Sequence, residues 1–482
     1  MSLKLCHDIL FEIASHLDPL DCVRDHDILN PSEALRERQE TILSLCLASS
    51  SFFDVFGPLL RRVVVDNGSS IRRSKLILHY LENPGEAAQV RGLCVCPSTL
   101  VSGNIEPELF AQPVFEQYVS EHDLSFPIRA LGILLSLLPN LEALKLSVQV
   151  HLNVDHQDLL NLFSKAVTSR SLLPKLKSVS LYYANKSQHG FDPRGIERML
   201  CLPNIDEISA RGFYTDKTNL LRAGQWAYLP GLRTSNVTVI RLLSCDVDTV
   251  FLDRIVRAAK SLKEFTYQWP SECFAEATFN ILQFVSSLSE HRRTLKKITF
   301  DASLTRCFDG SGQTIMPIGS FSSFERLEHL EMPAILLTGK RQTLTDFRLT
   351  ADNPRQDEYG MQLRERTTEE FKTAETRRHA DSAWQEIDWD ALVGLLPDST
   401  TTLVVQCPNL TSDLVGPAKW LQHFALTRLP HLANLHKVDL SSWSPQHLQV
   451  LFEVCGFHNV QHLFATHSCT LKLPDDYIFL RD

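Results

Sequence analysis

The chain has 482 residues, of which 44% are hydrophobic and 22% are charged, and this mixture is close to that of an average globular protein. Its 48 basic and 57 acidic residues give a formal net charge of −9. That balance argues against a nucleic-acid-binding or anionic-membrane-binding surface, because such surfaces are basic. About three ordinary domains fit this length, unless a repeat architecture replaces them, because a solenoid grows by adding units.

The start of the chain and its cysteines suggest a compartment. Residues 1–20 carry Asp8, Glu12 and Asp18 and have no uninterrupted apolar run, so we expect no secretory signal. The longest uncharged apolar stretches have about a dozen residues, whereas a membrane-spanning helix needs about twenty. The 12 cysteines are too few for a disulfide scaffold. We therefore expect reduced, buried thiols in a cytoplasmic or nuclear protein.

The first 56 residues are predicted to form short helices. Ile9, Ile13 and Leu17 are four residues apart, which is the spacing of one helix face. A polar stretch over 22–40 follows, for which we expect a loop. A second apolar segment at 42–53 is predicted to be helical again.

Beyond residue 60 a short motif, L-x-x-L-x-L, returns at steps of about 30 residues, which is typical of stacked repeat units. Apparent strands at 63–65 and 90–95 precede it. The motif then occurs in ten segments, at 141–146, 176–181, 205–210, 237–242, 262–267, 295–300, 327–332, 403–405, 435–440 and 460–465. Residues 252–259 and 281–288, ahead of two of these strands, have the spacing of an amphipathic helix. Each unit is thus predicted to be helix, turn and strand, a pattern that an ordinary α/β domain would not repeat so often.

With these strands, roughly residues 60 to 470 resemble an irregular leucine-rich repeat protein that contains helices, although the asparagine of the consensus turn is mostly missing. The resemblance implies an α/β solenoid with a curved parallel sheet on one side and helices on the other. We expect a small all-α segment at 1–56 and a repeat array at 57–482, with a charged insertion near 339–390. Residues 350–383 are about 41% charged, and we interpret them as a solvated helix or flexible insertion rather than a regulatory arm.

The N-terminal segment resembles an F-box. The matching residues are Leu5, Asp8, Ile9, Leu10, Ile13, Leu17 and Leu20 in the first half and Leu43, Leu47, Ala48, Ser49 and Phe52 in the second. Cys6 stands where the family has proline, and the stretch over 22–40 separates the two halves. A plain helical cap that covers the end of the solenoid is the alternative.

The F-box resemblance implies a substrate-recognition adaptor of a ubiquitin ligase. Its N-terminal segment would dock the linker protein Skp1 and through it a cullin, and its repeats would bind a protein substrate for ubiquitin-dependent degradation. The expected Skp1 contacts are Leu5, Cys6, Ile9, Leu20 and Leu43. A leucine-rich-repeat scaffold for protein-protein interaction, without any ligase association, is the alternative function.

The substrate is expected on the outward face of the sheet. Side chains alternate along a strand, so the residues between the motif leucines point away from the core. Such a face is polar by default, and solvation alone explains any single position. As a set, the expected substrate contacts are Lys145, Ser147, Ser180, Tyr182, Arg211, Thr266, Gln268, Asp301, Glu331 and Asp439.

No pattern indicates an enzyme. His458 and His462 would have the spacing of two metal ligands on a helix, but the predicted strand at 460–465 separates them. Cys94 and Cys96 share one strand face without a second pair to complete a zinc site. We therefore predict no catalytic residues, no metal and no cofactor.

Overall fold

The computed structural model describes most of the helices and strands of the chain. The described residues are 7–24, 31–66, 70–95, 126–148, 163, 173–183, 194–213, 231–270, 281–301, 320–334, 336, 396–406, 415–427, 429–443, 448–449, 451 and 457–474. They belong to two compact units, Met1–Leu262 with Phe274–Ala277, and Lys263–Cys273 with Thr278–Asp482. The predicted charged insertion and Cys6, which stands where the F-box motif has proline, lie outside the described residues.

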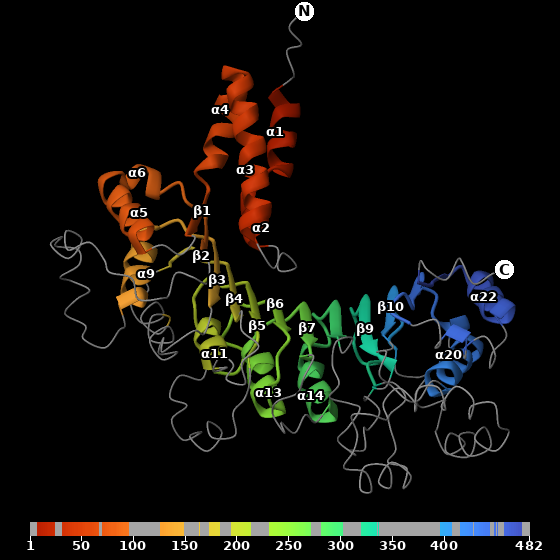
Figure 1. Ribbon diagram of the computed structural model, residues 1–482. Helices are drawn as coiled ribbons and strands as arrows, with labels where there is room; N and C mark the ends of the chain where they lie inside the picture. The colour runs from red at the N-terminus through yellow and green to blue at the C-terminus, as the bar shows by residue number, and fades with distance from the viewer. Residues whose placement is uncertain are drawn as a thin grey trace, which may run out of the picture. The chain divides into compact units, whose positions relative to one another are not determined.

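The predicted N-terminal helical segment is present in the first unit (Figure 1). Its helices are α1 (His7–His16), α2 (Pro19–Arg24), α3 (Pro31–Ala48) and α4 (Ser50–Leu60). The side chain of Ser49 caps α4 by accepting a hydrogen bond from the backbone N–H of Ser51. The core between α1, α3 and α4 consists of Leu10, Ala14, Ile42, Cys46, Val55 and Phe56.

The loop expected over 22–40 is wrong over most of its length, because α3 already begins at Pro31. Proline suits the first position of a helix, where its missing N–H would have no partner. Glutamate, alanine, leucine and arginine then follow, and all are good helix formers. Leu35 in this stretch is fully buried, so tertiary packing also supports the added turns.

Six strands of the first unit run parallel, each paired with the next along the chain. They are β1 (Val63–Asp66), β2 (Gly92–Val95), β3 (Ala143–Val148), β4 (Ser178–Tyr183), β5 (Glu207–Arg211) and β6 (Val239–Leu243). The helices between them are α5 (Ser70–Glu82), α6 (Pro84–Ala87), α9 (Phe126–Leu137) and α11 (Arg194–Leu200), and α13 (Thr249–Ala258) follows β6. The pairing register aligns the apolar motif residues Leu93, Leu144, Val179, Ile208 and Ile240 in one buried row.

The second unit repeats this arrangement. Its strands are β7 (Glu264–Gln268), β8 (Lys297–Asp301), β9 (His329–Pro333), β10 (Thr402–Gln406), β11 (Lys437–Asp439) and β12 (Thr470–Lys472). Its helices are α14 (Ile281–Leu288), η3 (Ser289–His291), α20 (Val415–Thr427), η4 (Leu429–His431) and α22 (Phe457–Thr466). The aligned core residues Phe265, Ile298, Leu330, Leu403 and Val438 are fully buried. Parallel strands in chain order with intervening helices confirm the predicted α/β solenoid.

The last predicted strand, at 460–465, is wrong: these residues lie in α22, and the final strand is β12. Val460 and Phe464 are four residues apart, which fits one face of a helix as well as it fits the strand motif. The side chain of Phe464 is buried. His458 and His462 therefore share one helix, contrary to the strand that we expected to separate them.

Asparagines in the turns tie neighbouring units together. In each case the side-chain amide donates a hydrogen bond to a backbone carbonyl of the preceding unit. These bonds join Asn140 to Ala88 at 2.7 Å, Asn204 to Pro174 at 2.5 Å, Asn236 to Pro203 at 2.8 Å and Asn434 to Asp398 at 2.9 Å. Although the consensus turn asparagine is mostly missing, these asparagines join turns of neighbouring units. None of the helices in the described part of the chain has the length and apolar character of a membrane span.

Candidate functional site

The N-terminal helices expose an unusual share of apolar side chains. Nine large apolar side chains are exposed among the described residues, and six of them lie on α1, α3 and α4. We call these six the helical apolar set: Ile9, Phe11, Ile13, Leu43, Leu47 and Phe53. Leu47 has the most exposed side chain, at 79%. Because the segment has a closed core of its own beneath them, the exposure does not reflect an unformed interior.

Spacing gives the helical apolar set a regular form. Ile9 and Ile13 are one turn apart on α1, and Leu43 and Leu47 are one turn apart on α3. Each helix thus presents a short apolar ridge. Polar side chains accompany the ridge on α3, where Arg36 and Glu40 form an exposed ion pair at 3.5 Å. Such a combination of apolar centre and polar surroundings is typical of a protein-binding surface.

The expected Skp1 contacts differ in whether the structure describes them and in how exposed their side chains are. Ile9 and Leu43 are exposed and belong to the helical apolar set. Leu5 and Cys6 lie outside the described residues. Leu47 matched the family motif, but we did not predict it as a contact, although its place one turn after Leu43 is the signal that could have identified it.

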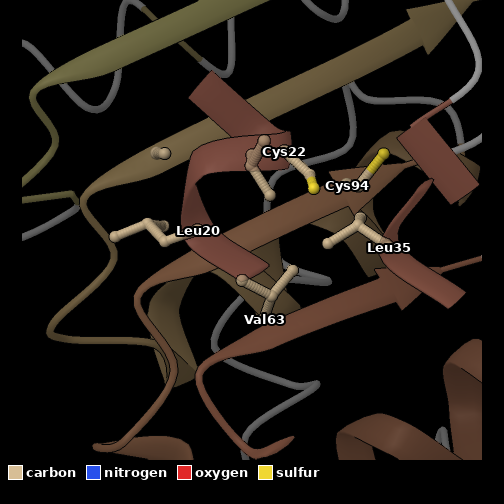
Figure 2. Packing of buried hydrophobic residues seen from close by; sticks show 7 residues of the cluster. Leu20, Cys22, Leu35, Val63 and Cys94 are labelled. Atoms are coloured by element: carbon tan, nitrogen blue, oxygen red, sulfur yellow. The ribbon is translucent and has the colours of Figure 1, made fainter. Parts of the chain in front are cut away.

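Leu20 does not lie on an exposed surface, so its prediction as a partner contact is wrong. It is 1% exposed, and it packs α2 against the sheet of its own chain. Figure 2 shows Leu20 and Cys22 on this short helix, above the strands that carry Val63 and Cys94. The full cluster is Leu20, Cys22, Val23, Leu35, Val63, Cys94 and Ala143.

Polar contacts fix both ends of α2. At its start, Asp18 Oδ2 lies 2.7 Å from Nη1 of Arg62, and Arg38 donates a hydrogen bond to the Asp18 carbonyl at 2.8 Å. At its end, Arg24 Nη2 lies 3.2 Å from Oε2 of Glu142, just before β3. Burial raises the pKa of Glu142, but the hydrogen bond from Lys177 and the charges of Lys177, Arg24 and Arg91 lower it more, so the pKa is below its ordinary value.

The outward sheet face of the first unit is less accessible than predicted. Lys145 and Ser180 are each 1% exposed and Tyr182 is 6% exposed, so their prediction as solvent-facing contacts is wrong. The register places Lys145 beside Ser180 on the next strand, and its ammonium group lies 4.9 Å above the ring of Tyr182. The two side chains therefore form a cation–π contact within the sheet face. Ser147 and Arg211 are half-buried.

On the outward sheet face of the second unit, four of the predicted substrate contacts are partly accessible to solvent. Thr266, Gln268, Asp301 and Glu331 are half-buried. The amide of Gln268 donates a hydrogen bond to Asp301 Oδ2 at 2.6 Å, across the pair β7–β8. This bond holds the carboxylate in one orientation on the sheet.

Glu331 on β9 is held in the same way. The amide of Gln406 donates to its Oε1 at 2.7 Å, and His329 Nε2 lies 3.7 Å from its Oε2. Burial raises the pKa of Glu331, but hydrogen bonds from His329 and Gln406 and nearby positive charge lower it more, so the pKa is below its ordinary value. An ionised, oriented acceptor of this kind can bind donor groups of a protein partner.

Asp439 on β11 is 6% exposed, so its prediction as an open contact is wrong. Its Oδ2 lies 2.8 Å from Lys437 Nζ, and its Oδ1 accepts from the backbone N–H of Ser441 at 2.9 Å. These contacts use both carboxylate oxygens. Lys437 and Lys472 are the more exposed members of this group.

The described residues contain no group of three or more His, Cys, Asp or Glu side chains that could hold a metal ion.

The comparisons with known proteins concern the repeats. Residues 155–346 match a family model described as a leucine-rich repeat domain, and this range includes β4 to β9. A search of curated proteins found no match. Residues 155–346 are thus similar to a leucine-rich repeat domain, and α1 to α4 lie outside the matched range.

Proposed function

We propose that the protein is a non-enzymatic substrate adaptor of a Skp1–cullin–F-box ubiquitin ligase, acting in the cytoplasm or nucleus. Helices α1, α3 and α4 dock a Skp1-like linker protein, which in turn binds a cullin. The outward face of the repeat sheet holds a protein substrate. The observation that carries this proposal is the helical apolar set, which gathers most of the exposed large apolar side chains of the described residues in the segment that resembles an F-box.

The energetics support docking at this surface. Burying a leucine, isoleucine or phenylalanine side chain is worth about 1.5–3 kcal/mol. Two ridges with one-turn spacing, Ile9 with Ile13 and Leu43 with Leu47, can receive an apolar helix of the partner. Since a few buried apolar anchors dominate most interfaces, these side chains can serve as the anchors of this one.

The substrate surface is better supported in the second unit than in the first. Asp301 and Glu331 are half-buried and oriented by Gln268 and Gln406, whereas Lys145 and Ser180 are buried. A substrate protein that binds here contacts charged and amide groups already held in place. Preorganised groups lose little conformational freedom on binding, which favours affinity.

Co-expression with Skp1 tests the docking proposal. The wild-type chain is expected to co-purify with Skp1, and the double variant Leu43→Asp with Leu47→Asp is expected to lose it. Leu426→Asp is the matched control, because Leu426 is also an exposed leucine on a helix, α20, but lies outside the segment. Thermal unfolding of all three proteins checks that the repeats remain folded. A folded wild-type chain that never captures Skp1 contradicts the proposal.

The second candidate is a repeat scaffold that binds protein partners without a ligase. The observation in its favour is that the matched family model covers the repeats only. In that case proximity labelling in cells recovers the same neighbours with the wild-type chain and with the Leu43→Asp, Leu47→Asp variant. Cullin and Skp1 peptides that disappear only with this variant favour the adaptor.

A further inference from the structure

Helix α2 occupies part of the sheet face on which a repeat protein would be expected to bind its partner. Side chains alternate along β1 and β2, and Val63, Gly92 and Cys94 share the face opposite the buried row of Leu93. Ala143 continues this face on β3. Leu20, Cys22 and Val23 of α2 belong to the same buried cluster as Val63, Cys94 and Ala143, and Figure 2 shows Leu20 and Cys22 beside Val63 and Cys94.

Gly92 is the point of closest approach between α2 and the sheet. A Cβ atom placed on Gly92 would lie 2.9 Å from Leu20 Cδ1, 3.0 Å from Val63 Cγ2 and 3.2 Å from Val23 Cγ2. Gly92 is not among the described residues with a positive φ, so its backbone does not demand glycine. The lack of room for a side chain is therefore the reason for glycine at this position, since any Cβ atom here would push α2 outward.

We propose that Gly92 is a positioning residue for the docking helices, and that β1 to β3 serve as the seat of α2 rather than as a recognition surface. The description of α1, α3 and α4 as docking helices rests on the proposed function, whereas the seat itself does not. A partner of the repeats then reaches the outward sheet face only beyond β3. The orientation of the docking helices relative to β1, β2 and β3 follows from how closely α2 approaches Gly92.

The contacts at both ends of α2 agree with a fixed seat. Asp18 at its start is held by Arg62, next to β1, and Arg24 at its end is held by Glu142, next to β3. A helix of six residues is too short to be stable alone, so its position is set by these contacts and by the cluster beneath it. Its orientation is consequently sensitive to one added methyl group at Gly92.

A size-exchange cycle tests the seat in the full-length chain. The variants are Gly92→Ala, Leu20→Ala and the two combined. Gly85→Ala is the matched control, because a Cβ on Gly85 meets nothing within 4 Å. The first readout is amide hydrogen exchange of residues 19–24, with residues 178–183 of β4 as the internal reference.

Gly92→Ala is expected to speed exchange in 19–24 by about tenfold, the effect of overpacking at a tight site, and to leave 178–183 unchanged. In the Leu20→Ala background the same substitution is expected to have a clearly smaller effect, because Leu20 Cδ1 is gone. Gly85→Ala is expected to change neither segment. Unchanged exchange in Gly92→Ala, or equal effects of this substitution in both backgrounds, overturns the proposal.

A second readout separates positioning from simple loss of stability. Spin labels on non-natural residues at exposed Glu37 of α3 and exposed Leu232 of the array report the distance between the helices and the repeats. We expect one narrow distance distribution in the wild type, a broader or shifted one in Gly92→Ala, and partial return in the combined variant. An identical distribution in all variants overturns the proposal. Skp1 capture is measured separately, so its failure would contradict only the adaptor function.

Discussion

Arg24 Nη2 lies 3.2 Å from Oε2 of Glu142, and this ion pair joins the end of α2 to the turn before β3. Glu142 is shared with two further cations, because Lys177 Nζ lies 3.1 Å from Oε2 and Arg91 Nη1 lies 3.6 Å from Oε1. One carboxylate thus connects the N-terminal helices, β2 and β4. The following predictions concern this pair and comparable contacts elsewhere in the array.

The Arg24–Glu142 pair is expected to stabilise the first unit modestly. In a double-mutant cycle of Arg24→Ala and Glu142→Gln, we expect a coupling energy of about 0.5–1 kcal/mol, because Arg24 is partly exposed and water screens the pair. Urea unfolding measures it. Arg36→Ala with Glu40→Gln is the control, since both side chains are largely exposed and their coupling should be at or below the lower end of this range. A coupling near zero for Arg24 and Glu142 would show that α2 does not depend on this contact.

Acid should weaken the attachment of α2. The pKa of Glu142 is below its ordinary value of 4.5 in the folded protein, so its contribution to stability is fully present above that value. The contribution is lost as the pH falls through the lower folded pKa. Hydrogen exchange of residues 19–24 should therefore accelerate in this acidic range relative to β4. Glu142→Gln should remove most of that relative change, and an equally steep pH dependence in this variant would contradict the assignment.

The bond from the Asn204 amide to the Pro174 carbonyl should support the stacking of units. We expect Asn204→Ala to lower the free energy of unfolding by about 1 kcal/mol, the usual net value of one hydrogen bond. Asn83→Ala is the matched control, because its amide bonds to the His79 carbonyl within the same local turn. Hydrogen exchange should locate the loss for Asn204→Ala at the turn before β5. Similar exchange profiles for the two variants would argue against a role between units.

Gln406 should keep the carboxylate of Glu331 ionised. Replacing Gln406 by alanine removes a hydrogen bond that favours the charged form, so the pKa of Glu331 should rise toward or above its ordinary value. Carbon-13 NMR of the glutamate carboxyl groups measures this shift. Gln268→Ala is the control, because Gln268 donates to Asp301 instead. An unchanged titration of Glu331 in Gln406→Ala would contradict the role assigned to Gln406.

The repeated strands could be predicted from the sequence because each one is defined locally. The leucines of 141–146, for example, mark a strand whose alternation is visible within six residues, and β3 lies there. The segment 460–465 failed because Val460 and Phe464 satisfy a helical spacing as well. The final strand, Thr470–Lys472, is only three residues long and carries no repeat motif, so no local pattern in the sequence predicts it.

The candidate site could be predicted only in part, because exposure depends on contacts between distant segments. Ile9 and Leu43 were predicted as partner contacts from the resemblance to an F-box, and their side chains are exposed. Leu20 has the same apolar character, but its burial depends on Gly92, which the sequence gives no reason to place beneath it. Likewise, Lys145 is buried and lies against the ring of Tyr182 on the next strand, and only the register brings the two together.

The seat of α2 also has a practical consequence for truncation. Val63, Cys94 and Ala143 belong to the buried cluster that the residues of α2 and Leu35 of α3 complete. Removing the N-terminal helices would expose these side chains to water as an apolar patch beside the edge strand β1. Exposed edge strands of this kind are common sites of aggregation. We therefore expect a chain without these helices to aggregate, so it would not report the properties of an isolated repeat domain. Point substitutions in Leu43 and Leu47 are the cleaner way to separate the roles of the two parts.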